Sequence, residues 1–268
     1  MTKEARILDR SGCKVHYWVE GPEDAPVVVL THGATLDHRM FDPQMASLTA
    51  KFRTIRWDLP GHGRSKPVPA EFSLAGAVED LIAILALEKV DQVTLIGQSM
   101  GGDLCQEFLY RHPRRVARIV LIGCVPLIRA TGLLAPLRTR WSNLKMRFVP
   151  LARFRDKVVE SAACKPQVQA YARQCLEQMS RGDLLATWKA ISSAAHEDTG
   201  YQLPCPALMI VGEQDAVGNG WVRQAALDWA KTEPSAELAR IPAAGHITNM
   251  DAPDTVTQRI LSFLNQAG

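Results

Sequence analysis

A serine flanked by glycines is the residue of this chain whose type and spacing best suit chemistry. Ser99 lies in the stretch LIGQSMGGDL, where Gly97 and Gly101 complete the pattern Gly-x-Ser-x-Gly. The preceding run VTLIG predicts a strand, and the residues from Gly101 onward predict a helix. In that setting the motif indicates a nucleophile elbow, a sharp turn that projects the hydroxyl out of a sheet. The alternative is an ordinary glycine-rich connection in which the serine has no role.

A serine hydroxyl is a weak nucleophile until a base takes its proton. His246 is the best candidate, because its loop IPAAGHITNM lies between the last predicted strand and the last predicted helix. The other histidines fit this task less well by position. We expect His32 to bond to backbone and shape its own loop, and His62 to have a structural role in the turn PGHGRS. His38 remains a candidate for the substrate pocket.

The base in turn needs an acid that fixes its tautomer and stabilises its charged form. Asp215 follows the predicted strand ALMIVG and precedes His246 in the chain. Glu213 is two residues nearer to the strand, and we expect it not to reach the histidine loop. The order Ser99, Asp215, His246 is one in which such triads occur. Negative charge that develops on the substrate oxygen would be stabilised by two backbone amides that donate hydrogen bonds to it. The predicted donors are the amide of Met100, directly after the nucleophile, and the amide of Ala34 in the loop THGAT.

Strands that alternate with helices must position these loops. Apolar runs bounded by turn residues predict strands at 14–21, 26–33, 52–58, 92–97, 116–123, 207–212 and 236–242, and helical periodicity predicts helices at 73–90, 101–112 and 251–266. The turn DRSG predicts an N-terminal hairpin, and Asp251 is predicted to cap the last helix. This alternation predicts an α/β fold with a mostly parallel central sheet flanked by helices. Ligands bind such sheets at the carboxyl ends of the strands, where the candidate residues fall.

One segment interrupts the alternation. Residues 126–200 contain helical stretches and no convincing strand, so they are interpreted as a helical cap inserted into a core made of 1–125 and 201–268. The segment has 12 Lys and Arg against 6 Asp and Glu. One hypothesis is that the basic cap favours anionic or amphiphilic substrates. The plainer interpretation is a set of amphipathic helices with solvated basic faces over the site.

Composition narrows the class of protein. The chain has 268 residues and a net charge of +3, too small to indicate a nucleic-acid partner. Its six cysteines are scattered without a Cys-x-x-Cys pair, which favours reduced thiols and argues against a metal site. A secretory leader and a membrane span are not expected, so a cytoplasmic location without stable membrane insertion is predicted. The stretch GQSMGG lacks the spacing of a dinucleotide fingerprint, and no cofactor is expected.

The motifs LTHG, DLPGHGRS, GQSMGG, VGEQD and AGH occur in this order, and through them the chain resembles the α/β-hydrolase fold superfamily, serine-nucleophile branch. The resemblance implies Ser99 as nucleophile, His246 as base, Asp215 as acid, and the amides of Ala34 and Met100 as oxyanion donors. Residues 126–200 resemble the variable helical cap of that family. A serine at the elbow sets the chain apart from epoxide hydrolases and haloalkane dehalogenases, which have aspartate there. Phe41 stands where the family often has tryptophan.

The predicted activity is that of an esterase or lactonase acting on a small molecule. Ser99 would open an ester, lactone or thioester through an acyl-enzyme. Hydrolysis of a carbon–carbon bond beside a ketone and perhydrolysis use the same triad and remain alternatives. A ligand-sensing receptor of the same fold is an alternative from another class. Whether the chain is a monomer or a homodimer is left open.

Overall fold

The computed structural model describes residues 4–10, 12–69, 71–128, 149–198 and 200–266. Its strands are β1 (Arg6–Arg10), β2 (Cys13–Glu20), β3 (Val27–Thr31), β4 (Arg53–Trp57), β5 (Val93–Gln98), β6 (Val116–Ile122), β7 (Ala207–Gly212) and β8 (Ala236–Ile241). They form one eight-stranded sheet in the order β1-β2-β4-β3-β5-β6-β7-β8. The pairs from β4 to β8 are parallel, and β2 is antiparallel to both β1 and β4. The mostly parallel sheet and the N-terminal hairpin are therefore confirmed.

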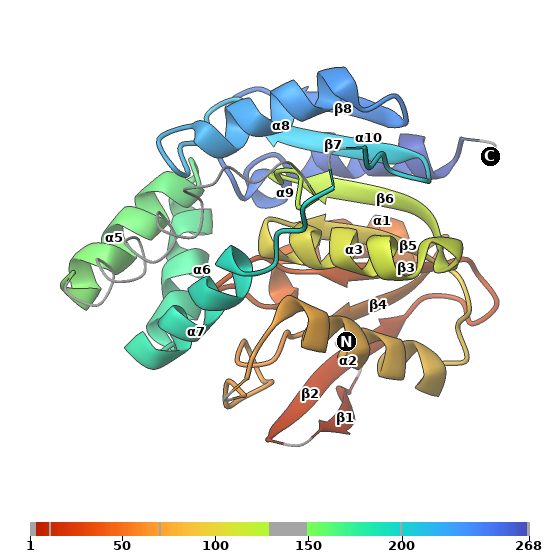
Figure 1. Cartoon of the computed structure of the whole chain (residues 1–268), viewed down its shortest axis with the longest axis horizontal. Helices are drawn as coiled ribbons and strands as arrows, with labels where there is room; N and C mark the ends of the chain where they lie inside the picture. The colour runs from red at the N-terminus through yellow and green to blue at the C-terminus, as the bar shows by residue number, and fades with distance from the viewer. Residues whose placement is uncertain (1–3, 11, 70, 129–148, 199, 267–268) are drawn as a thin grey trace.

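Helices cover both faces of this sheet (Figure 1). Outside the segment between β6 and β7, the described helices are η1 (His38–Phe41), α1 (Asp42–Thr49), α2 (Leu74–Leu87), α3 (Met100–Arg111), η2 (Pro113–Arg115), α8 (Trp221–Thr232), α9 (Thr248–Asp251) and α10 (Pro253–Leu264). Successive strand residues point to opposite faces. Thus Leu95 of β5 packs in the core under α2 and α3, while Ile96 packs in the core under α1 and α10. Burial on both faces explains why the central strands are continuous apolar runs.

Between β6 and β7, the described residues form three helices. They are α5 (Leu151–Ala162), α6 (Pro166–Glu177) and α7 (Arg181–Ser192), and they lie together at one end of the sheet (Figure 1). Val159 and Leu176 pack into the core cluster on the α1 and α10 face, so the helices are joined to the sheet domain by apolar contact. The cap boundaries at 126 and 200 stay a prediction.

The basic stretch of this segment lies partly outside the described residues, at 129–148. Three described arginines bond within the protein. Arg155 donates to the Met179 carbonyl at 2.8 Å, Arg181 donates to the Val149 carbonyl at 2.9 Å, and Arg173 pairs with an aspartate of α5. These contacts give the three side chains a structural role, and the two interpretations of the basic residues both stay predictions.

The start of the closing helix differs from the expectation. Asp251 does not cap α10, because it is the last residue of α9 and the N-cap position belongs to Ala252. The Asp251 carboxylate instead accepts backbone hydrogen bonds from Cys164 and Lys165, at 2.9 and 3.0 Å, and from Gly245 at 2.8 Å. The prediction that Asp251 is the N-cap of the last helix was wrong. The tertiary fold brings three backbone amides to its carboxylate, and they form hydrogen bonds with it instead.

None of the helices in the described part of the chain combines the length and apolar character needed to cross a bilayer. All six cysteines are free thiols.

Candidate active site

Ser99 occupies the sharp turn between β5 and α3. Its φ of 50° lies in the left-handed region, which costs a non-glycine residue conformational energy. Its amide donates to the Ile122 carbonyl of β6 at 2.9 Å, and its carbonyl accepts from Gly102 and Asp103 of α3. Ser99 is the N-cap residue of α3, but its side chain makes no capping hydrogen bond. The hydroxyl is thus left available beside the positive end of a helix dipole.

Glycines make this turn possible. A Cβ on Gly97 would lie 2.4 Å from the Gly101 carbonyl oxygen, and a Cβ on Gly101 would lie 2.2 Å from the Thr31 carbonyl oxygen. A Cβ on Gly102 would lie 2.1 Å from Cys124 Sγ. Strand and helix therefore approach more closely than any side chain would permit, which gives the glycines around Ser99 a steric reason.

His246 and Asp215 are brought together from the loops after β8 and β7. Nδ1 of His246 lies 2.7 Å from Oδ2 of Asp215, and both residues are buried. The second oxygen of Asp215 accepts the Val217 amide at 2.9 Å, which fixes the carboxylate. Because a carboxylate only accepts, Nδ1 carries the proton and Nε2 is left with a free lone pair. This is the tautomer that a general base needs.

Glu213 faces elsewhere, as the sequence predicted. Its carboxylate pairs with Arg240 at 2.9 Å, and both side chains are exposed. Its carbonyl accepts from Arg223 at 2.6 Å. Asp215 is the acid that the structure places on His246.

Two glycines that sequence reasoning missed make room for the histidine loop. A Cβ on Gly123, which follows β6 at a φ of 61°, would lie 2.9 Å from His246 Nδ1. A Cβ on Gly212, the last residue of β7, would lie 2.2 Å from the Gly245 carbonyl oxygen. Both glycines stand at the end of a predicted strand, and this position could have indicated that another loop packs closely there.

The two predicted oxyanion donors lie at the ends of neighbouring strands. Met100 is the first residue of α3, so its amide has no carbonyl partner within the helix. Ala34 follows β3, which pairs with β5 up to the register Thr31↔Gly97. In the described residues, Ser99 Oγ forms no hydrogen bond with His246, and such a contact is often loose until substrate binds.

The remaining histidines near the sheet edge are occupied. His32 donates from Nδ1 to the Gly33 carbonyl at 2.7 Å and accepts the Leu59 amide on Nε2 at 2.9 Å, so its predicted role in shaping the loop is confirmed. His38 lies 2.8 Å from Asp58 and stacks on Trp18, with the ring centroids 3.6 Å apart. Both ring nitrogens of His32 are engaged, so this ring is not free to act as the base for Ser99, whereas the bond to Asp58 engages only Nδ1 of His38.

Because His62 is buried, we expect it to make the free energy of unfolding depend measurably on pH. Burial lowers the pKa of this imidazole to about 3, and its Nδ1 donates to the Pro60 carbonyl. An unfolded histidine has a pKa of about 6.5, so between these values only the unfolded chain binds the proton. The unfolding free energy should fall with falling pH by up to about 1.4 kcal/mol per pH unit for this residue. Burial also lowers the pKa of His32, which adds to the same trend.

We expect the variant His62→Gln to have a smaller slope of unfolding free energy against pH between about 4 and 6. Urea unfolding at a series of pH values measures this. The wild type unfolded at the same pH values is the reference. Equal slopes for the wild type and His62→Gln would contradict the assignment.

Asp37, His38 and Asp58 bring their ligand atoms within 4.8 Å of one another. Their oxygens already accept from protein donors. Asp37 is bound by the Arg39 guanidinium at 2.7 Å, and Asp58 accepts from His38 and from the Arg64 amide. Burial alone would raise the pKa of Asp37, but the hydrogen bonds and the positive charge of Arg39 help to lower it to about 2. The cluster is therefore an ion-pair network at the loop that follows β3.

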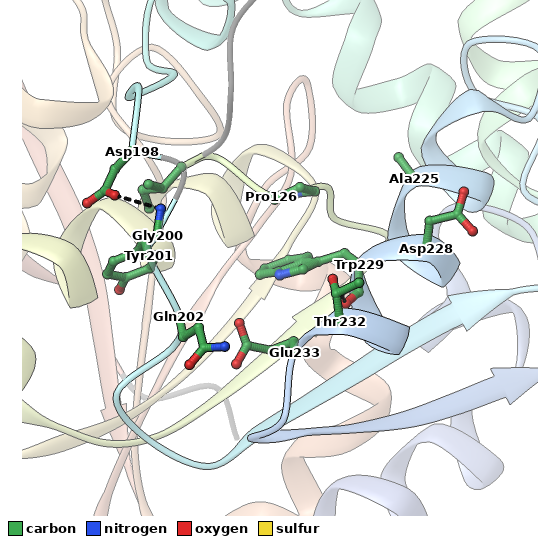
Figure 2. A pocket seen from close by; sticks show the side chains of 11 residues that line it. Pro126, Asp198, Gly200, Tyr201, Gln202, Ala225, Asp228, Trp229, Thr232 and Glu233 are labelled. Carbon is green, nitrogen blue, oxygen red and sulfur yellow. Dashed lines mark hydrogen bonds between the residues drawn. The ribbon is translucent and has the colours of Figure 1, made fainter.

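A pocket of about 570 Å³ lies between α8 and the residues Asp198 and Gly200–Gln202 (Figure 2). Its lining comprises Pro126, Ile128, Asp198, Gly200, Tyr201, Gln202, Ala225, Asp228, Trp229, Thr232 and Glu233. Figure 2 shows the Trp229 ring beneath Pro126, with Glu233 and Gln202 facing each other below it. None of Ser99, Asp215 and His246 lines this pocket, so it is separate from the candidate active site.

Comparison with known proteins agrees with the fold. A family model described as the alpha/beta hydrolase family matches residues 28–259. The chain is 24% identical to 3-oxoadipate enol-lactonase 1 of Acinetobacter baylyi, over 96% of each chain. It is 26% identical to carboxylesterase YbfK of Bacillus subtilis, over 94% of this chain and 84% of the relative. A solved structure of a thermophilic esterase from Thermogutta terrifontis, with malate bound, superimposes with a TM-score of 0.83 at 24% identity over 98% of each chain. The chain belongs to the alpha/beta hydrolase family.

Proposed function

We propose that this chain is a serine hydrolase that cleaves a carboxylic ester, lactone or thioester through an acyl-enzyme. Family membership and the esterase and lactonase relatives support a hydrolase of ester bonds. Two features of the candidate active site carry the serine mechanism: the turn that presents Ser99, and the hydrogen bond between His246 and Asp215. Ser99 has a strained backbone and an uncommitted hydroxyl at a helix N-terminus, and the His246–Asp215 pair is built in the base tautomer.

In the proposed reaction, Ser99 Oγ attacks the substrate carbonyl carbon while His246 Nε2 takes the hydroxyl proton. The carbonyl oxygen becomes an oxyanion, which the amides of Ala34 and Met100 stabilise. His246 then gives the proton to the leaving alcohol or thiol, and the carbonyl re-forms as an acyl-enzyme. Water enters, loses a proton to His246 and attacks the acyl carbon. The bond from that carbon to Ser99 Oγ then breaks, His246 returns the proton to Oγ, and the acid is released. Asp215 remains ionised throughout and stabilises the imidazolium.

We further propose that residues 126–200 act as the cap of this site, on a core of 1–125 and 201–268. The contacts of α6 support this. Tyr171 donates its hydroxyl to the Asp37 carbonyl at 3.1 Å, in the loop 32–37 that carries Ala34 and is called the oxyanion loop. The loop before α6 is held by Asp251, which also binds the amide preceding His246. The α6 helix and the loop before it are thus bonded to residues near two of the loops that the mechanism uses, those after β3 and β8.

A substrate panel tests the proposal. We expect purified protein to hydrolyse at least one of p-nitrophenyl butyrate, a γ-lactone and a short acyl thioester on the order of 10³-fold faster than the Ser99→Ala variant, or more. Release of p-nitrophenol, acid or thiol gives the rates. Equal rates for both proteins on every compound would overturn the proposal. The described contacts favour neither carbon–carbon hydrolysis nor perhydrolysis over ester cleavage.

A further inference from the structure

Gln98 is a buried polar residue that the mechanism above does not use. It is the last residue of β5 and directly precedes Ser99. Its side chain is 1% exposed. A buried primary amide costs free energy unless hydrogen bonds replace those it made with water. Its contacts therefore indicate why an amide stands at this position.

The nitrogen of this amide binds the histidine loop. Gln98 Nε2 donates to the backbone carbonyl of His246 at 3.1 Å. Only the nitrogen end of the amide can bond to a carbonyl, so the chemistry of the contact fixes the orientation of the side chain. One hydrogen bond thus ties the strand that presents the nucleophile to the backbone of the base.

The oxygen of the same amide lies against the oxyanion loop. A Cβ on Gly33 would lie 2.0 Å from Gln98 Oε1, so the amide fills the space that any other residue at position 33 would need. Gln98 Oε1 is buried and has no hydrogen-bond partner in the described residues. An unsatisfied buried acceptor is a cost to stability that an apolar side chain of the same length would avoid.

We propose that Gln98 is a positioning residue for the proposed hydrolysis, holding the His246 loop in register with the nucleophile turn and the oxyanion loop. This inference rests on the proposed function. The imidazole is already held on one side by Asp215. Gln98 fixes the backbone from which that imidazole projects, and so sets how the ring approaches Ser99.

Other contacts keep the loop folded without Gln98. Asp251 accepts the Gly245 amide at 2.8 Å, and Thr248 donates its hydroxyl to the Gly245 carbonyl at 2.8 Å. Removing the Gln98 bond should therefore shift the histidine rather than unfold the loop. A displacement on the order of 1 Å from the reactive geometry costs on the order of 100-fold in rate.

Gln98→Met tests this role, because methionine keeps the unbranched shape and removes both the donor and the unsatisfied acceptor. We expect kcat on p-nitrophenyl butyrate to fall roughly 10- to 100-fold while KM stays within about threefold. The melting temperature should stay near the wild-type value. Hydrogen exchange of residues 242–247 should increase, which gives a readout independent of any substrate.

Gln44→Met is the matched control. Gln44 is also a buried glutamine, and its Nε2 donates to the Asn249 carbonyl, three residues beyond His246, at 3.0 Å. Asn249 returns a hydrogen bond to Gln44 at 3.2 Å, so this variant should lose stability and keep its kcat within about twofold. We therefore expect Gln98→Met to lower kcat with little change in melting temperature, and Gln44→Met to lower the melting temperature with little change in kcat.

The outcomes distinguish the two proposals. A Gln98→Met variant with kcat within twofold of wild type and unchanged exchange would overturn the positioning role and leave the hydrolase intact. Loss of kcat together with a melting temperature as low as that of Gln44→Met would reduce Gln98 to a structural residue. A wild-type chain with no activity on the substrate panel would overturn the proposed function itself. Raised loop exchange in Gln98→Met would then still establish its hold on the loop.

Discussion

The Ser99→Ala variant is expected to lose hydrolysis almost completely, with kcat lower on the order of 10⁶-fold, as in a well-studied serine triad. The fold should persist for a specific reason. Ser99 is the N-cap residue of α3, but its side chain makes no capping hydrogen bond, and its strained backbone is held by contacts of its amide and carbonyl. Removing the hydroxyl therefore removes a nucleophile and no structural contact. Initial rates and thermal unfolding measure the two effects.

Ser73→Ala is the matched control for this variant. Ser73 caps α2, and its hydroxyl accepts the Gly76 amide at 3.1 Å. Its loss should lower the unfolding free energy by about 1 kcal/mol and leave kcat unchanged. If Ser99→Ala kept a tenth of the wild-type rate, Ser99 would not be the nucleophile.

The second large effect is expected for Asp215→Asn, with kcat lower by about 10⁴-fold. The two oxygens of Asp215 have different partners, the Val217 amide and His246 Nδ1. In the variant the amide oxygen stays on the Val217 amide, so the NH₂ group faces Nδ1. The imidazole must then accept at Nδ1 and carry its proton on Nε2, where it cannot take a proton from Ser99. Steady-state rates on the same ester measure the loss.

Glu213→Gln provides the comparison, since it makes the same chemical change two residues away. Glu213 pairs with Arg240 on the exposed surface, and such pairs contribute between about 0 and 1 kcal/mol. Its kcat should stay close to wild type. Equal losses in the two variants would mean that Asp215 does not orient the base.

Much of the candidate site was predictable because each residue follows a strand of a parallel sheet. Alternating apolar runs and helices predict the sheet, and such a sheet gathers the loops after β3, β5, β7 and β8 at one edge. Ser99, Asp215 and His246 could thus be grouped without knowing any contact. Asp215 was separated from Glu213 by its distance from the strand end.

Contacts between loops distant in sequence were not predictable. Gln98 bonds to a carbonyl 148 residues away, and Gly123 is small because an imidazole from another loop needs its space. Asp251 had the local pattern of an N-cap, but tertiary packing gives it better donors. Such contacts depend on strand order and loop shape, which local propensity does not encode.

The helices α1 and α8 were also not predicted from the sequence. The α1 helix is eight residues long, shorter than the window in which helical periodicity can be recognised. The α8 helix does carry apolar residues at helical spacing, at positions 222, 226 and 230, but it fully buries only Ala226 and exposes Trp221, and this pattern was not used to predict a helix. Packing on the sheet stabilises these helices more than their own sequences do.

Covalent labelling tests the central assignment most directly. A fluorophosphonate reacts with a serine only where a neighbouring base activates it, and it requires no knowledge of the natural substrate. After reaction, peptide mass spectrometry should find one adduct, on Ser99, with labelling absent in Ser99→Ala and strongly slowed in Asp215→Asn. An adduct on another residue, or an unlabelled Ser99 in protein that hydrolyses esters, would contradict Ser99 as the nucleophile.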